Sequence, residues 1–277
     1  MKIIRDKKEL DSFLIEIREK NEKIGLIPTM GSIHKGHISL VKKSIEAELI
    51  SLVTIYINPT QFNSKEDYEK YPKSIKKDIK LLKDINCHAI YFPKEKEIYT
   101  DGVKSKKTVN KYRNILCDKY RDGHFDGVTT VVESLFKLVN PKYAFFGEKD
   151  FQQLKIIKNL EEILDLKIKI VKCPSIRHKN GISFSSRLMK LSQIENVILN
   201  KGAKILSVLI KDIKLNINKV NFEYYKSKLL DIGVKRIEYI EIRDEQNLEM
   251  SLKCYNSRLF VCMYIGSIRL IDNFKLY

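Results

Sequence analysis

The sequence predicts an α/β protein: a Rossmann-like, doubly wound parallel sheet followed by a smaller C-terminal α+β domain. Short apolar strands alternate with amphipathic helices as far as residue 174, the order that builds a parallel sheet. The strands are nearly all apolar, as strands covered on both faces are. After residue 187 the pattern changes to long helices and then clustered strands. We therefore expect two domains, 1–175 and 176–277.

The individual elements follow from hydrophobic spacing and from turn residues. Apolar residues at helical intervals predict helices at 7–18, 74–82, 123–139, from 147 onward, 192–210 and 221–230. Short runs of β-branched and apolar residues predict strands at 24–28, 49–57, 88–92, 143–146, 166–171, 234–242, 258–265 and 267–271. Residues 93–116 are polar and lack periodicity, so we expect a loop or a hairpin there, and a polar stretch begins at Ser64.

Length and composition restrict the class of protein. The chain has 277 residues, of which 43% are hydrophobic, enough for a sizeable core. No run approaches the roughly 18 apolar residues of a membrane span, and Met1–Asp6 becomes charged before a signal-peptide core develops. The five cysteines are odd in number and widely spread, without a Cys-x-x-Cys pair, which favours reduced thiols. We expect a cytoplasmic protein without a membrane partner.

The formal charge of +17 raises the possibility of a nucleic-acid-binding protein. However, the lysines are spread along the chain and mixed with acids, as in 65–67 and 94–97. No basic stripe with interleaved aromatic residues is present. A solvated basic surface, which attracts anionic substrates, explains the charge, and we expect no nucleic-acid partner. A basic RNA-binding module remains the alternative from another class.

The chain is organised around residues 24–41, where an apolar strand ends in a turn of small residues and a helix begins. Backbone N–H groups and the helix dipole at such a junction bind phosphate. His34 and His37 are three residues apart, so on a helical turn both imidazoles share one face. Two solvated histidines at a helix start are the alternative.

These residues carry a family resemblance. Pro28-Thr29-Met30-Gly31 followed by His34-Lys35-Gly36-His37 resembles the signature of the pantothenate synthetase (pantoate–β-alanine ligase) family, within the nucleotidyltransferase superfamily that includes class I aminoacyl-tRNA synthetases. Further matching stretches cover essentially the whole chain, in family order. They are Asn58-Pro59-Thr60-Gln61-Phe62, residues 120–128, Gly147-Glu148-Lys149-Asp150-Phe151-Gln152-Gln153, residues 181–187 and Leu270-Ile271-Asp272-Asn273.

The resemblance implies a two-step reaction. ATP activates the carboxylate of pantoate to give pantoyl adenylate and diphosphate, and the amine of β-alanine then displaces AMP to form pantothenate. The resemblance makes His37, His34 and Lys149 the catalytic residues, because leaving diphosphate needs hydrogen-bond donors and positive charge. The alternative for Lys149 is an exposed lysine at a helix start. No protein nucleophile is required.

Binding residues also follow from the resemblance. The residues implied for ATP are Met30, Gly31, His34, Gly36, His37, Gly147, Glu148, Lys149, Asp150, Ile176, Phe184, Ser185, Ser186 and Arg187. Gln61, Gln153, Asn58 and Arg121 are the implied substrate residues, since amides can hydrogen-bond a carboxylate without neutralising it.

Three assignments carry named alternatives. Ser185 could simply cap a helix. Mg²⁺ is the expected metal, and Asp78 occupies the position of the family's metal-associated acid, with a surface carboxylate as its alternative. His124 is expected to shape its loop rather than react.

Two departures from the family pattern concern a mobile loop. Leu188 follows Ser-Ser-Arg where asparagine is usual, and His178 follows Arg177 where an acid is common. Both bear on how that loop packs when the second domain closes as a lid. The family also suggests a homodimer. Another adenylate-forming nucleotidyltransferase, or a truncated aminoacyl-tRNA synthetase, is the closest alternative activity.

Overall fold

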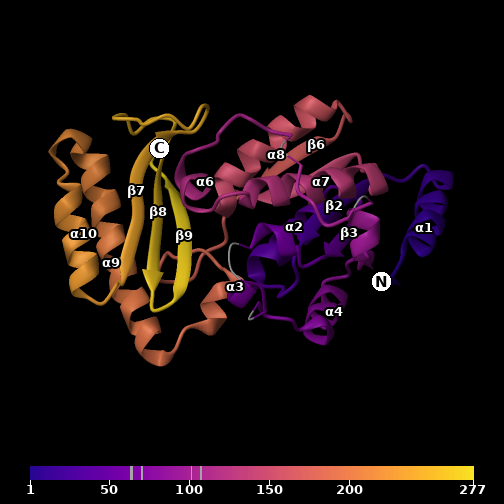
Figure 1. The fold of residues 1–277 in the computed structure, drawn as a ribbon, viewed down its shortest axis with the longest axis horizontal. Helices are drawn as coiled ribbons and strands as arrows, with labels where there is room; N and C mark the ends of the chain where they lie inside the picture. Colours follow the sequence, from indigo (N-terminus) through magenta and orange to yellow (C-terminus); the bar gives the residue numbers. More distant parts are fainter. Residues whose placement is uncertain (63–64, 70, 101, 107) are drawn as a thin grey trace. The chain divides into compact units, whose positions relative to one another are not determined.

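The computed structural model describes residues 1–277 except Asn63, Ser64, Lys70, Asp101 and Lys107, so the predicted start of the polar stretch at Ser64 lies outside the described residues. The chain divides into two compact units (Figure 1). Unit 1 comprises Met1–Glu148 and Gln153–Pro174, and unit 2 comprises Lys149–Gln152 and Ser175–Tyr277.

Unit 1 is built on a six-stranded sheet in the order β1-β4-β3-β2-β5-β6, in which every neighbouring pair is parallel. The strands are β1 (Lys2–Ile4), β2 (Ile24–Thr29), β3 (Ile50–Ile55), β4 (Ala89–Tyr91), β5 (Tyr143–Gly147) and β6 (Lys169–Cys173). The predicted doubly wound α/β class is confirmed. β2 lies between β3 and β5, so the order reverses there, and ligands of open α/β sheets bind outside the carboxyl ends at such a point.

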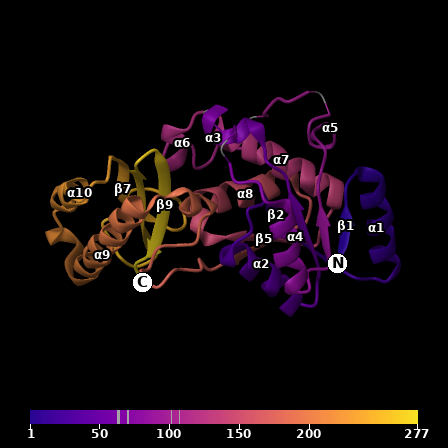
Figure 2. The same ribbon diagram turned by 90° about the horizontal axis from the view of Figure 1, so that it is seen from below.

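Helices cover both faces of this sheet. They are α1 (Lys7–Glu19), α2 (Lys35–Glu46), α3 (Lys65–Glu69), α4 (Ile75–Asp84), α5 (Glu95–Ile98), α6 (Leu116–Tyr120), α7 (His124–Val139) and α8 (Phe151–Leu164). Figure 2 shows α2 and α4 on one side of the sheet and α7 and α8 on the other. Leu40 and Val41 of α2 and Leu82 of α4 share one buried cluster with Ile27 and Val53 of the sheet.

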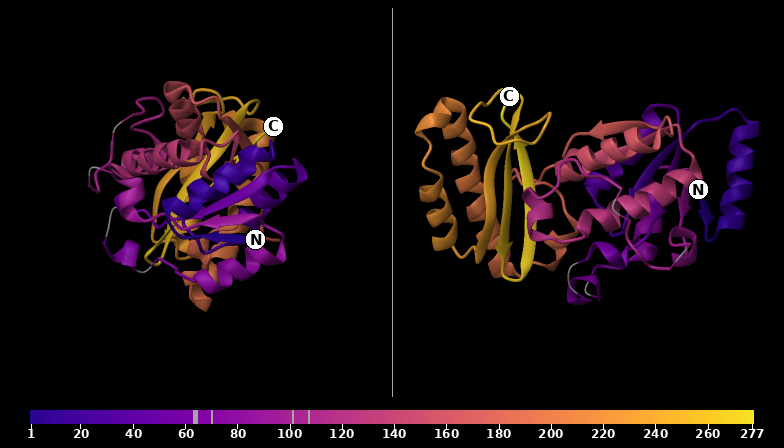
Figure 3. Two further views of the ribbon diagram at one scale, coloured as in Figure 1. Left: turned by 90° about the vertical axis from the view of Figure 1, so that its right-hand side faces the viewer. Right: turned by 45° about the horizontal axis from the view of Figure 1, so that its top comes forward.

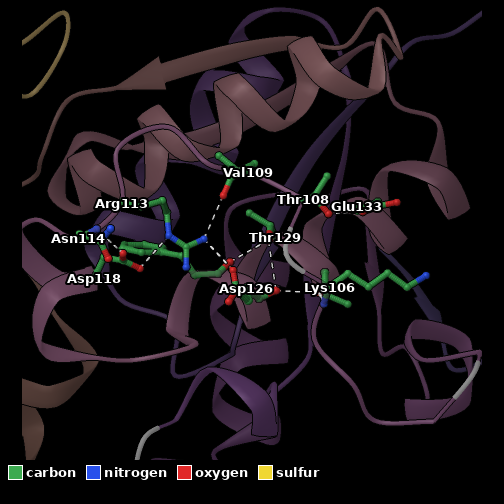
Figure 4. Close-up of polar contacts among 11 residues, drawn as sticks. Lys106, Thr108, Val109, Arg113, Asn114, Asp118, Asp126, Thr129 and Glu133 are labelled. Carbon is green, nitrogen blue, oxygen red and sulfur yellow. Dashed lines mark hydrogen bonds and ion pairs between the residues drawn. The ribbon is translucent and has the colours of Figure 1, made fainter.

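The long loop before α7 is the part of unit 1 that differs most from expectation. Residues 93–116 contain the short helix α5. β1 had no predictive signal, because it begins at the charged Lys2 and only two apolar residues precede Arg5. Figure 4 shows how the loop is held: the Arg113 guanidinium points between Asp118 and Asp126, at 3.0 and 2.7 Å, and also donates to the Val109 carbonyl. Arg113 is mostly buried, so this ion-pair cluster ties the loop to α7.

Unit 2 is a three-stranded antiparallel sheet with two long helices. The strands β7 (Arg236–Asp244), β8 (Ser257–Ile265) and β9 (Ile268–Lys275) pair in sequence order. The helices α9 (Gln193–Asn216) and α10 (Phe222–Asp231) pack on one face of that sheet, as the right-hand view of Figure 3 shows, and share its apolar core. The predicted elements are confirmed here, although α9 ends six residues later than the expected 192–210.

Candidate active site

The turn between β2 and α2 has an unusual backbone. Gly31 has φ +77° and Ser32 has φ +53°, so a non-glycine residue occupies the left-handed region. Asp78 of α4 holds this turn: its Oδ2 accepts the Ser32 N–H and its Oδ1 accepts the Ile33 N–H, both at 2.8 Å. Burial raises the pKa of the Asp78 carboxyl, against the two N–H donors.

His34 and His37 begin the helix that follows this turn. His34 is the N-cap of α2, and its Nδ1 accepts the Gly36 N–H at 3.1 Å. Because Nδ1 is an acceptor, neutral His34 carries its proton on Nε2. The His37 ring stacks on His34 with 4.0 Å between centroids. Both rings are half-buried, which contradicts the alternative of two solvated histidines.

A second polar loop leaves the same edge of the sheet after β3. The short 3₁₀ helix η1 (Pro59–Gln61) is capped by Asn58, which is 1% exposed. Asn58 Oδ1 accepts the Thr60 N–H, and Asn58 Nδ2 donates to the Gly127 carbonyl at 3.0 Å. These two backbone partners determine which end of the Asn58 amide is oxygen and which is nitrogen.

The orientation of Asn58 determines that of Gln61. Asn58 Nδ2 also donates to Gln61 Oε1 at 3.2 Å, so the Gln61 amide turns its Nε2 away, toward Met30 Sδ. Tyr99 adds a hydroxyl donor to Asn58 Oδ1, and burial raises the Tyr99 pKa, which keeps that donor protonated. The Asn58 side chain therefore makes hydrogen bonds to protein groups, and one of them supports the Gln61 amide.

Arg121 and His124 hold the main-chain carbonyl of Gln61. Arg121 Nη2 donates to the Gln61 carbonyl at 2.9 Å, and His124 Nδ1 lies 2.7 Å from that oxygen. Arg121 Nη1 is 3.1 Å from His124 Nε2. A carbonyl only accepts and a guanidinium only donates, so these contacts require neutral His124 with its proton on Nδ1. His124 shapes this loop, as expected, and Arg121 is not a solvated arginine.

Gly127 permits this arrangement. A Cβ added there would lie 2.6 Å from Thr60 Oγ1 and 2.8 Å from the Thr60 carbonyl oxygen, closer than real contacts allow. The first turn of α7 thus approaches η1 closely because residue 127 has no side chain.

In unit 2, the segment Lys149–Gln152 is held by the sheet. Asn273 Nδ2 donates to the Lys149 carbonyl at 2.9 Å, and Asn273 Oδ1 accepts from Arg258 at 2.8 Å. Phe151 lies under the Arg258 guanidinium, with 4.3 Å from Cζ to the ring centroid. The Lys149 side chain is 19% exposed and pairs with Asp150 at 3.1 Å, which contradicts the alternative of a freely exposed lysine.

The hairpin that leads to the predicted ATP-binding residues Ser185, Ser186 and Arg187 is also in unit 2. It is held by Asp272 of β9, the residue next to Asn273. Asp272 Oδ2 accepts from Arg177 at 3.0 Å and from the Ser183 N–H at 2.9 Å. Ile176 and Phe184 pair in the same hairpin through the Phe184 N–H.

Ser185 begins the 3₁₀ helix η3 (Ser186–Lys190) that follows this hairpin. It caps η3 by accepting the Arg187 N–H at 3.3 Å, so the capping alternative describes its local structure. Leu188 packs on the core of unit 2, and His178 stacks on Phe184 at 3.6 Å. Both departures from the family pattern therefore affect packing.

The structure brings the predicted residues together within each unit. In unit 1, Met30, Asn58, Gln61 and Arg121 are joined by hydrogen bonds. Gly147 ends β5, Glu148 pairs with Lys172 at 3.1 Å, and Gln153 is half-buried on α8.

The support residues Tyr99, Gly127, Asp272 and Asn273 were not predicted to act. For Gly127, Asp272 and Asn273 a signal existed, because they belong to matching stretches, but the spacing alone gave them no role.

The surroundings of Asp78 argue against its role as a magnesium ligand. Its side chain is 1% exposed and both oxygens accept backbone N–H groups, whereas Mg²⁺ keeps several waters. It is not a surface carboxylate either. Across the part of the chain that the structure describes, no group of three or more His, Cys, Asp or Glu residues could hold a metal ion.

A parallel sheet with loops from β2 and β3 meeting at its switch point, and a histidine-rich helix start beside them, defines an α/β nucleotide-binding enzyme. Comparison with known proteins narrows this class. The family model described as pantoate-beta-alanine ligase matches residues 2–275. A pantothenate synthetase of Azobacteroides pseudotrichonymphae is 40% identical, with 99% of each chain covered, and one of Thermotoga petrophila is 37% identical with the same coverage.

Solved structures agree. The pantoate-beta-alanine ligase of Francisella tularensis, a complex with β,γ-ATP and β-alanine, has a TM-score of 0.87 at 35% identity, covering 100% of this chain and 98% of that one. Pantothenate synthetase of Thermus thermophilus has a TM-score of 0.88 at 28% identity, with 100% of both chains covered.

The chain belongs to the pantoate–β-alanine ligase family. It is an AMP-forming ligase that condenses pantoate with β-alanine through pantoyl adenylate.

Proposed function

We propose that the residues of unit 1 divide the reaction between two loops. The start of α2, with His34 and His37, binds the triphosphate of ATP, and Gln61 binds pantoate through its amide N–H. Support comes from the Asn58 contact, which turns Gln61 Nε2 toward Met30, on the turn that leads to His34. A pantoate carboxylate accepting from this amide lies beside the α-phosphate it attacks.

Catalysis on this proposal is electrostatic and positional. Negative charge grows on diphosphate as it leaves, and N–H donors from imidazoles and a helix start stabilise that charge. Gln61 and Gln153 hold the nucleophilic carboxylate without protonating it. β-Alanine then attacks the acyl carbon, its ammonium having lost a proton, and AMP leaves. Holding the reactants in register adds to this acceleration, because it replaces a bimolecular encounter with a step inside the bound complex.

Unit 2 supplies further phosphate ligands on this proposal. Lys149 provides an ammonium, Ser185, Ser186 and Arg187 provide hydroxyls and a guanidinium, and Asp150 accepts from the ribose. Family membership supports these roles, as do the supports from Asp272 and Asn273 that order both segments. We assign residues 1–175 to nucleotide and pantoate binding and 176–277 to a lid that keeps water from the adenylate.

We also propose how the metal is bound, the oligomeric state and the cellular location. Mg²⁺ enters with ATP, bound to its phosphates, since Asp78 does not fit as a ligand. The chain forms a homodimer, on the strength of the family resemblance alone, and light scattering of the purified protein tests this. The five cysteines, which form no disulfide, fit the reducing cytoplasm. Within the described ranges, no helix is long and apolar enough to cross a membrane.

Pantoate-dependent exchange of labelled diphosphate into ATP, measured without β-alanine, tests the division of roles. We expect Gln61→Ala to raise the KM for pantoate at least tenfold with little change in the KM for ATP. In the same exchange assay His37→Ala should be slow, and its control is His88→Ala, which removes an exposed histidine at the amino end of β4. Normal pantoate kinetics in Gln61→Ala would remove its role. Exchange that requires tRNA or another acid would favour a different adenylate-forming enzyme.

A further inference from the structure

Asp78 makes two short contacts with the turn that precedes His34. It lies in the first turn of α4, and its two oxygens accept the N–H groups of Ser32 and Ile33, each at 2.8 Å. The third neighbour is Gly31, where an added Cβ would come within 3.0 Å of Asp78 Oδ2. One carboxylate therefore binds two consecutive N–H groups of the turn and occupies the space beside Gly31 that a side chain there would need.

The turn needs such a support. Gly31 and Ser32 both have left-handed backbone angles, +77° and +53°, and a serine adopts that region uncommonly. Such conformations persist only where contacts with the surrounding structure determine them. The two charge-assisted hydrogen bonds that Asp78 accepts determine this turn, because they form only when the donating N–H groups point toward α4.

The next residue after this turn is the N-cap His34. Its ring position follows from the direction in which the chain leaves Ile33, since Nδ1 is already engaged by Gly36. We propose that Asp78 is a positioning residue, not a metal ligand: it holds the left-handed turn at Gly31–Ile33 and thereby places the His34 imidazole for ATP. This inference rests on the proposed phosphate-binding role of His34.

Two observations separate this role from stability and from metal binding. Burial raises the pKa of the Asp78 carboxyl, while the two backbone N–H groups that it accepts favour its charged form. Carboxyls whose pKa is shifted by burial and by specific partners occur more often at functional sites. A side chain that is 1% exposed also leaves no surface on which a hydrated magnesium ion can rest.

The test compares Asp78→Asn with Asp84→Asn, which removes an exposed carboxylate from the last turn of the same helix. The asparagine keeps one acceptor and turns an NH₂ toward the other backbone N–H. Pantoate-dependent ATP–diphosphate exchange is measured per ATP-binding site, counted by titration, while Mg²⁺ is varied. We expect Asp78→Asn to lower the rate per site by about 10- to 100-fold, the usual effect of misplacing a catalytic group by about 1 Å. The Mg²⁺ activation constant should stay within about twofold of wild type, and Asp84→Asn should behave normally.

Three results overturn the proposal. A rise of about tenfold or more in the Mg²⁺ activation constant, with the rate restored at saturating metal, makes Asp78 a ligand. An unchanged rate per site removes the positioning role. A fall only in the number of ATP-binding sites, with normal turnover at those that remain, reduces Asp78 to a structural residue.

A measurement on the wild-type chain covers the case in which Asp78→Asn does not fold. Crystals with a non-hydrolysable ATP analogue and Mn²⁺ locate the metal by anomalous scattering. We expect the peak at phosphate oxygens and more than about 4 Å from both Asp78 oxygens, and a peak at bonding distance, about 2.1 Å, would overturn the inference. The proposed role of His34 fails separately, if His34→Ala keeps its exchange rate.

Discussion

Replacing Asn58 with aspartate should reverse the amide of Gln61 while leaving its position nearly unchanged. The new carboxylate keeps the acceptor that Thr60 and Tyr99 bind, but it puts a second acceptor where Nδ2 now donates to Gln61 Oε1 and to the Gly127 carbonyl. The Gly127 carbonyl cannot turn away, so the variant should also be less stable. Gln61 relieves its own repulsion by rotating its amide, so that Nε2 donates to the carboxylate. Its Oε1 now faces the substrate side.

The size of the effect follows from the bond that pantoate loses. An amide N–H donated to a carboxylate contributes about 2 kcal/mol, which corresponds to roughly 30-fold in kcat/KM for pantoate. Repulsion between the reversed Oε1 and the substrate carboxylate adds to this, so about 30- to 100-fold is expected. The KM for ATP should change little, because His34 and His37 keep their contacts.

Steady-state kinetics with pantoate varied, together with thermal unfolding, provide the assay. Gln61→Glu should reproduce the defect, since it also presents an oxygen to the substrate. Tyr99→Phe is the matched control: it removes a donor from the Oδ1 side of Asn58 and leaves the Nδ2 contact intact. A folded Asn58→Asp enzyme with kcat/KM for pantoate within about threefold of wild type would refute the reasoning.

Three further outcomes are expected. His37→Ala should lower the adenylation rate by about 10²-fold or more, as loss of a transition-state donor does, and near-normal single-turnover kinetics would remove the role. Asn273→Ala should lower kcat by about tenfold by releasing the Lys149 main chain, with unit 2 still folded by circular dichroism; an unaffected kcat would disconnect the two residues. Glu238 is buried against Arg269 at 2.7 Å, and although burial alone raises the pKa, hydrogen bonding to this guanidinium lowers it below 4.5. The contribution of Glu238 to the free energy of unfolding is therefore present above pH 4.5 and lost as the pH falls further. In urea unfolding, Glu238→Gln should lower the free energy of unfolding by about 3 kcal/mol at neutral pH and leave it unchanged in strong acid.

Much of the fold could be predicted because its signals are local. The strand-turn-helix at 24–41, the apolar run at 49–57 and the helix at 123–139 each carry their own pattern of side chains. β1 could not be predicted, because three residues that lie among charged side chains acquire strand structure only by pairing with β4. α5 lies in a polar stretch without periodicity.

The site residues were predicted from motifs, but the role of each depends on contacts with residues that are distant in the sequence. Asn58 was expected to line a substrate pocket, yet a carbonyl 69 residues away, at Gly127, and the buried Tyr99 make it a support for Gln61. Asp78 was expected to bind metal or solvent, and the N–H groups of a turn 45 residues earlier engage it instead. The spacing of residues along the chain does not predict such partners.

The most direct test of the central claim observes the Gln61 amide itself. In protein labelled with ¹⁵N-glutamine, the side-chain NH₂ resonance of Gln61 is assigned by its loss in Gln61→Ala and followed as pantoate is added. We expect a downfield proton shift of one Gln61 N–H that saturates with pantoate. If that resonance stays in place while pantoate binds, Gln61 does not donate to the substrate, and the proposed division of the site is wrong.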